Sequence, residues 1–160
     1  MIRKVRSADA DEITAIYNKY ITDTTITFEV DTLTTDEMKR RIEGVSAKFP
    51  YYVYESDGHV LGFCYAHQWK ERAAYSKTLE TTIYLSPKCL HQGIGTALMQ
   101  KLIPECKALG FHALIACITE GNDASVQMHR SLGFEQVSHF KRVGMKFGRM
   151  LDVVDLELML

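Results

Sequence analysis

The chain has 160 residues and a formal net charge of −1, with 19 lysines and arginines against 20 aspartates and glutamates. This length suits a single hydrophobic core, and we expect residues 1–160 to form one domain. Basic and acidic residues are interleaved along the chain, which argues against a broad electrostatic surface for nucleic acid or for an anionic membrane. A small molecule or a protein is the expected partner.

The four cysteines, Cys64, Cys89, Cys106 and Cys117, lack the close pairing of zinc sites and the spacing of a disulfide framework. We therefore expect reduced thiols, most of them buried, and no metal. No stretch approaches the roughly 20 apolar residues that span a bilayer, and the N-terminus has no apolar signal core. These patterns predict a soluble cytoplasmic protein.

The first part of the chain alternates between strand and helix patterns. Apolar alternation over residues 2–5 predicts a strand, and helical spacing over residues 13–20 predicts a helix after it. The β-prone run TTITFEV at residues 24–30 predicts a short strand. Thr35 or Asp36 is then expected to cap a second helix.

The middle of the chain is rich in predicted strands. The pair Asp57-Gly58 joins the strand patterns at residues 51–56 and 59–66, and this pair is the strongest short-range hairpin signal in the sequence. A further strand is predicted at residues 78–85.

The C-terminal part continues the alternation of strands and helices. Its expected elements are a helix over 97–109, a buried strand over 111–119, a short helix over 122–133, a strand and loop over 134–148 and a terminal strand over 152–160. The whole pattern predicts a mixed α/β domain.

The glycine-rich turn CLHQGIGT joins the strand at 78–85 to the following helix. Gly93 and Gly95 allow close approach of the backbone to an anion at the start of that helix. A nucleotide-triphosphate loop needs Lys followed by Ser or Thr after its last glycine, and a dinucleotide fold needs a third glycine. Neither occurs here. An isolated G-x-G pair also fits a tight turn that holds no ligand.

Four motifs follow one another along the chain: TLETTIYLS, HQGIGTAL, GNDASVQMHRSLGF and KFGRMLDVVDLEL. Together they resemble the GNAT superfamily of N-acetyltransferases, and more narrowly its phosphinothricin and methionine sulfoximine acetyltransferase family. The resemblance spans essentially the whole chain. It implies a predominantly antiparallel sheet flanked by helices, acetyl-coenzyme A (acetyl-CoA) as cosubstrate, and a homodimer.

The resemblance places acetyl-CoA in a splay beside the strand that ends at Leu85. The cofactor-binding residues that it implies are Ile83, Tyr84, Leu85, His91, Gln92, Gly93, Ile94, Gly95, Thr96 and Asn122. Backbone donors at a helix start suit a diphosphate, and an unpaired strand edge suits the amide-bearing arm. The chain departs from the family at Leu90, where Gln or Arg is usual, and at Met150, where Trp is common.

Acetyl transfer requires a neutral amine, so a base must take a proton from it. The resemblance makes Glu80 that base, and the alternative is a solvent-facing glutamate in a half-exposed strand. His129 stands where many members have a tyrosine that protonates the departing thiolate, and where the phosphinothricin branch has histidine. It can donate that proton, assist the base, orient substrate or serve as a structural histidine.

The amine pocket is the part of the site with the fewest sequence signals. By family position Phe28, Lys70, Arg72 and Tyr75 line or approach it, and the Arg72 guanidinium can pair with a carboxylate. The alternative for residues 69–75 is an exposed charged loop.

The resemblance implies an N-acetyltransferase for an amino-acid-like amine such as phosphinothricin or methionine sulfoximine. Two other functions stay open at this point. One is acetylation of another amine, for example an amino sugar, a polyamine or a protein terminus. The other is a module that binds acetyl-CoA without turnover.

Overall fold

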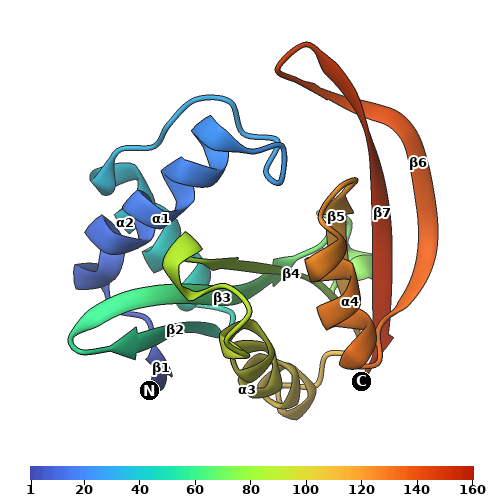
Figure 1. The fold of residues 1–160 in the computed structure, drawn as a ribbon. Coiled ribbons are helices and arrows are strands. Elements are labelled where there is room, and N and C mark those ends of the chain that lie inside the picture. The colour runs from blue at the N-terminus through green and yellow to red at the C-terminus, as the bar shows by residue number, and fades with distance from the viewer.

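The computed structural model describes residues 1–160 and contains a seven-stranded sheet in the order β1-β2-β3-β4-β5-β7-β6 (Figure 1). The strands are β1 Ile2–Lys4, β2 Tyr51–Ser56, β3 His59–Gln68, β4 Thr78–Leu85, β5 Ala113–Thr119, β6 Glu135–Lys146 and β7 Arg149–Met159. The helices are α1 Ala10–Asp23, α2 Thr35–Ser46, α3 Ile94–Ala108 and α4 Asp123–Ser131. All neighbouring strands are antiparallel except β4 and β5. The prediction of a mixed α/β fold with a mainly antiparallel sheet is confirmed.

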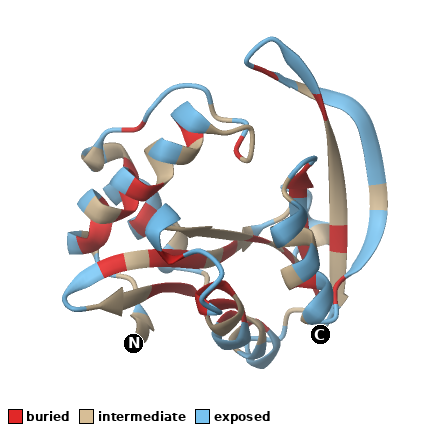
Figure 2. Cartoon of the chain, viewed as in Figure 1, coloured by how far each residue is buried: buried red, intermediate tan, exposed pale blue.

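Helices cover both faces of the sheet, and buried residues gather where they meet it (Figure 2). Helices α1 and α2 pack on one face through a cluster that includes Ile13, Ile42, Val53 and Phe63. Helix α3 packs on the other face, where α4 also adds side chains, around Leu79, Leu98, Leu102 and Leu114. Alternation along the central strands therefore directs successive side chains toward opposite helical layers.

The hairpin predicted from Asp57-Gly58 is present. Both residues have positive φ, +53° and +80°, which is the conformation that a two-residue turn of this kind requires. Ser56 pairs with His59 on either side of the turn, so the turn fixes the register of β2 against β3.

Two glycine-to-alanine substitutions are expected to change stability in opposite directions. Gly58→Ala places a Cβ at φ +80° and should lower the free energy of unfolding by about 1 kcal/mol. Gly44→Ala lies inside α2, with nothing within 4 Å of its added Cβ, and should raise that energy by about 0.5–1 kcal/mol. Urea unfolding measures both, and two changes of the same sign would contradict the assignment of the turn.

The strand predicted at residues 24–30 is wrong, because the structure has no strand there. Local side-chain bonds take the place of a ladder: Thr24 Oγ1 donates to the Tyr20 carbonyl at 2.7 Å, and Thr27 Oγ1 accepts from the Glu29 N–H. The buried Lys146 ammonium donates to the Thr27 carbonyl at 2.8 Å. These contacts satisfy the backbone of the segment without a neighbouring strand.

The predicted cap of the second helix is off by one residue. Thr34, and neither Thr35 nor Asp36, is the N-cap of α2, and its hydroxyl accepts from the Glu37 N–H at 3.2 Å. Thr34, Thr35 and Asp36 all have side chains that can cap a helix, so the sequence does not distinguish them. The path of the backbone decides that Thr34 is the N-cap.

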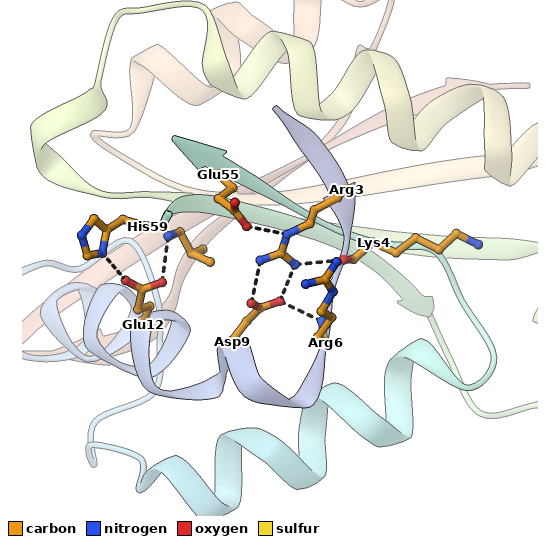
Figure 3. A network of polar contacts seen from close by, with 8 residues as sticks. Arg3, Lys4, Arg6, Asp9, Glu12, Glu55 and His59 are labelled. Atoms are coloured by element: carbon orange, nitrogen blue, oxygen red, sulfur yellow. Dashed lines mark hydrogen bonds and ion pairs between the residues drawn. The ribbon is translucent and has the colours of Figure 1, made fainter. Parts of the chain in front are cut away.

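A charged network ties β1 to β2 and to the turn before α1 (Figure 3). Arg3 donates to both carboxylate oxygens of Asp9 at 2.8 Å and to Glu55 at 2.6 Å. Asp9 also accepts from the Arg6 N–H at 2.7 Å. Burial raises the pKa of Asp9, but these bonds outweigh it and leave the pKa below its ordinary value. The network anchors the short first strand to the rest of the fold.

All four cysteines are free thiols, and Cys64, Cys89 and Cys106 are buried while Cys117 is exposed. No helix combines the length and the apolar composition that crossing a membrane requires. His, Cys, Asp and Glu side chains do not gather anywhere into a group of three that could bind a metal ion.

Candidate active site

The site begins where β4 and β5 part. Their parallel pairing covers only Thr78–Glu80 against Ala113–Ile115. Beyond this point β4 pairs with β3 alone, so the edge of residues 81–85 that faces β5 has no strand partner. A cavity of about 600 Å³ lies at this opening, between α1, β4, the start of α3 and the start of α4.

This first cavity brings together the residues that the sequence assigned to acetyl-CoA. Its lining includes all of them except Gln92, namely Ile83, Tyr84, Leu85, His91, Gly93, Ile94, Gly95, Thr96 and Asn122. The Gln92 side chain instead folds back, and its amide donates to the Lys88 carbonyl at 3.4 Å. The glycine turn thus forms a cavity wall as well as a tight turn.

The start of α3 fits a diphosphate. Gly93 is the N-cap in the left-handed conformation with φ +76°, and the first intrahelical bond runs from the Ala97 N–H to its carbonyl. The preceding N–H groups of the first turn therefore have no intrahelical acceptor, and no acidic side chain lies in that turn. The unpaired edge of β4 supplies backbone donors and acceptors for an amide-bearing chain.

Glu80 lies on β4 beside the opening, on the face that carries α1 and α2, because its neighbour Leu79 is in the core of the other face. Its side chain is 27% exposed. Burial raises the pKa of Glu80, while the nearby His67 and Cys117 side chains act in the opposite direction. A carboxylate with a raised pKa is a better proton acceptor than a fully solvated one.

His67 is a neighbour of Glu80 that the sequence did not indicate. The two residues are cross-strand partners in β3 and β4, and His67 Nε2 lies 3.9 Å from Glu80 Oε1. His67 Nδ1 lies 3.0 Å from the Gln68 carbonyl, to which it can only donate. Nε2 is therefore the free nitrogen of the neutral ring, and it faces the carboxylate.

His129 is buried in α4, with 2% of its surface exposed. Nδ1 donates to the Ser125 carbonyl at 2.8 Å, and Nε2 has no hydrogen-bond partner. Burial lowers the pKa of His129 despite this bond, so the ring is neutral at pH 7 with its lone pair at Nε2. Ser125 and Met128 of the same helix line the first cavity, whereas His129 itself does not.

The four residues expected near the amine pocket lie in two segments. Lys70 Nζ stands 4.2 Å from the centre of the Trp69 ring, and the Tyr75 ring meets Trp69 edge-on at 5.2 Å. Arg72 precedes the turn Ala73–Tyr75 and is exposed. Phe28 lies against β6, where a Cβ on Gly144 would overlap its ring. None of the four expected residues lines the first cavity.

A family model described as an acetyltransferase (GNAT) domain matches residues 2–154. The chain belongs to the GNAT acetyltransferase family. It is 40% identical over 155 residues to a phosphinothricin N-acetyltransferase of Alcaligenes faecalis, and this match covers 96% of this chain and 79% of that protein. It is 33% identical over 163 residues to an L-methionine sulfoximine/L-methionine sulfone acetyltransferase of Salmonella typhimurium strain LT2, covering 99% of this chain and 94% of that protein.

Solved structures of GNAT proteins share the fold. The crystal structure of a GNAT superfamily phosphinothricin acetyltransferase from Sinorhizobium meliloti in complex with acetyl-CoA has a TM-score of 0.96 and 36% identity. The match covers 100% of this chain and 88% of that chain. The resemblance seen in the four sequence motifs is confirmed.

This GNAT chain departs from the expected motifs at two exposed positions. Leu90 lines the first cavity and is 43% exposed, so its apolar side chain borders the start of α3. Met150, near the start of β7, is 42% exposed. Both substitutions lie at the surface, and neither removes a backbone donor of the glycine turn.

Replacing His67 by alanine is expected to shift the pH dependence of this GNAT enzyme. The nearby His67 side chain lowers the pKa of Glu80, so its removal should raise that pKa further. With Glu80 as the base proposed below, the acid limb of the kcat/KM profile should then move to higher pH, because a general base accepts a proton only in its ionised form. Rates recorded between about pH 5 and pH 9 measure the shift.

His59→Ala provides the matched control for His67→Ala. His59 lies at the exposed start of β3, where it contacts Glu12. Its removal should leave the acid limb in place. An acid limb that stays fixed, or moves to lower pH, in His67→Ala would exclude His67 as a charge partner of Glu80.

Proposed function

We propose that this protein transfers the acetyl group of acetyl-CoA to the amine of a small amino-acid-like substrate such as phosphinothricin or methionine sulfoximine. The observation that carries the proposal is the cavity of about 600 Å³ between the unpaired edge of β4 and the start of α3, with Glu80 on the same strand. The names of the relatives at 33–40% identity support this class of substrate.

Nine of the ten residues that the resemblance assigned to acetyl-CoA line this cavity and are proposed to bind it there, and the tenth, Gln92, is proposed to contribute through its backbone in the glycine turn. The start of α3 would hold the diphosphate through backbone N–H groups and the helix dipole. Residues Ile83–Leu85 would pair with the pantetheine arm along the free edge of β4. Asn122, at the start of α4, would lie near the thiol end. Bound acetyl-CoA supplies the activated thioester carbonyl.

Glu80 is the proposed general base. Its carboxylate accepts a proton from the substrate amine, directly or through one water, and the neutral amine then becomes the nucleophile. An N–H on the free edge of β4 would stabilise the negative charge that develops on the carbonyl oxygen. The neighbouring His67 side chain offsets part of the rise that burial causes in the pKa of Glu80.

His129 is the second residue proposed for proton handling. Its free Nε2 is an acceptor in the resting ring, because the Nδ1 proton is bonded to the Ser125 carbonyl. The ring must therefore take up a proton before it can give one to a departing thiolate. The described contacts support an acceptor or structural role more directly than that of a resting acid.

Four residues outside the first cavity are proposed to recognise the acceptor amine: Phe28, Lys70, Arg72 and Tyr75. Arg72 is exposed and forms no ion pair, so its guanidinium is available to pair with a substrate carboxylate. The Lys70 ammonium lies over the Trp69 ring, in the same loop as Arg72.

A homodimer is also proposed. The edge strand β6, its partner β7 and the turn between them carry six exposed apolar side chains: Val137, Phe140, Val143, Met145, Phe147 and Met150. An apolar edge of this kind is suited to burial against another copy. Sedimentation analysis should give twice 18.2 kDa, and a monomeric mass at micromolar concentration would overturn the dimer.

We further propose that residues 1–160 act as one catalytic domain in the cytoplasm. The terminal strands β1 and β7 belong to the same sheet, which supports one domain. Four free thiols fit a reducing compartment.

The direct test is incubation with acetyl-CoA and a panel of amines, with acetylated product followed by mass spectrometry. The panel contains phosphinothricin, methionine sulfoximine, an amino sugar, a polyamine and a peptide. Acetylation of the amino-acid analogues is the expected result. If only another amine is acetylated, the proposed amino-acid-like substrate class is wrong. If acetyl-CoA binds but no product forms, the protein is a binding module instead.

A further inference from the structure

A second cavity, of about 390 Å³, lies on the face of the sheet that carries α1 and α2. It is lined by Tyr17, Met38, Arg41, Gly44, Val45, Tyr51, Phe63, Tyr65, His67 and Tyr84. Aromatic rings form most of this lining, and several are in mutual contact, such as Tyr51 with Tyr65 at 4.8 Å between centres. The volume lies in the range of small-molecule sites.

The second cavity adjoins both parts of the proposed reaction centre. Tyr84 lines this cavity and also the first one, so the two spaces share one residue of β4 in their walls. His67 lines it as well, and its Nε2 lies 3.9 Å from the Glu80 carboxylate. If the amine of the acceptor lies beside Glu80, the rest of the acceptor molecule can therefore extend into this cavity.

The one arginine or lysine side chain that lines the second cavity has its charge compensated. Arg41 is its one arginine, and the guanidinium donates to both carboxylate oxygens of Glu29, at 3.0 and 2.7 Å. Glu37 lies 3.5 Å away on the same helix. The Tyr17 hydroxyl also donates to Glu29. A second anion, such as a phosphinate or a side-chain carboxylate, would lose its hydration here without gaining an ionic partner.

We propose that the second cavity receives the side chain of the acceptor, and that the preferred acceptor is an amino acid with an apolar or aromatic side chain. The inference rests on the proposed acetyl transfer at Glu80 and narrows its substrate class. Apolar burial against aromatic walls favours such side chains, and the Arg41–Glu29 pair leaves an anionic one unpaired.

The first test compares acceptors at saturating acetyl-CoA. L-phenylalanine and L-leucine are expected to have kcat/KM at least about tenfold higher than L-glutamate and phosphinothricin, since one buried apolar group changes specificity by roughly this factor. Higher kcat/KM for phosphinothricin or glutamate would overturn the inference and leave the proposed acetyl transfer intact.

The second test fills the cavity from α2. Gly44 lines it, and a Cβ added there meets nothing within 4 Å, so the side chain of Gly44→Phe begins in open space at the cavity wall and is expected to occupy part of the cavity. The KM for L-phenylalanine should rise at least about tenfold, with the Kd for acetyl-CoA unchanged. Arg40→Phe is the matched control, because Arg40 is exposed on the same helix and lines neither cavity.

A binding measurement keeps the inference testable if no amine turns over. N-acetyl-L-phenylalanine, titrated by calorimetry, should bind the wild type and Arg40→Phe but bind Gly44→Phe at least about tenfold more weakly. Weaker binding to Gly44→Phe, in a protein that acetylates no amine, would support the second cavity as the site of the side chain and would show that the proposed acetyl transfer is wrong. Equal binding to all three proteins, with Gly44→Phe folded by circular dichroism, would overturn the inference.

Discussion

Replacing Glu80 by glutamine is expected to lower kcat by about 10²- to 10⁴-fold, the usual contribution of a general base. Glutamine keeps the size of the side chain but cannot accept the proton of the amine. The KM for acetyl-CoA should change little, because Glu80 does not line the first cavity. Steady-state rates with the best acceptor of the panel measure the effect.

Glu135→Gln is the matched control for the Glu80 variant. Glu135 is exposed at the start of β6, and the same isosteric change there should leave kcat within a factor of about two. Circular dichroism and the midpoint of thermal unfolding establish that Glu80→Gln is folded. A folded Glu80→Gln enzyme with wild-type kcat from low to high pH would remove Glu80 as the base.

Replacing Gly95 by valine is expected to raise the Kd for acetyl-CoA by about 10- to 100-fold, which corresponds to a steric cost of 1–3 kcal/mol. A Cβ on Gly95 already lies 3.0 Å from Met128 Sδ and 3.5 Å from Ile83 Cδ1. The further methyl groups of valine would occupy the first cavity beside the start of α3. Calorimetric titration with coenzyme A measures the loss.

Gly95→Ala separates crowding from unfolding. Its single methyl meets the far end of the flexible Met128 side chain, which can move, so the Kd should rise less than in the valine variant. Equal thermal midpoints would show that both variants are folded. Wild-type affinity in a folded Gly95→Val protein would mean that acetyl-CoA does not bind in the first cavity.

The candidate site was predictable from sequence to the extent that it is local. The strand at 78–85, the turn with Gly93 and Gly95, and the helix after it are consecutive in the chain, so their motifs indicated one cavity wall. The side chains of the 69–75 loop are also consecutive, yet their motif did not indicate that Lys70 packs on Trp69.

The sequence by itself determined the order of most elements, the Asp57-Gly58 hairpin, the GNAT family and Glu80 as the proposed base. The element order and the hairpin depend on residues near one another in the chain, where turn chemistry and hydrophobic period act directly. The family and the proposed role of Glu80 come from the resemblance of four motifs spread along the chain. The sequence did not predict the irregular path of residues 24–30. One of the bonds that hold this path, from Lys146 to the Thr27 carbonyl, joins segments that are far apart in the chain.

Only the tertiary structure decided the partner of Glu80 and the shape of the second cavity. His67 meets Glu80 through the register of β3 against β4, and the long connection from Gln68 to Thr78 leaves that register open in the sequence. The second cavity combines side chains of α1, α2, β2, β3 and β4. Sequence periodicity assigns a residue to a face, but packing of separate elements decides which faces enclose a space.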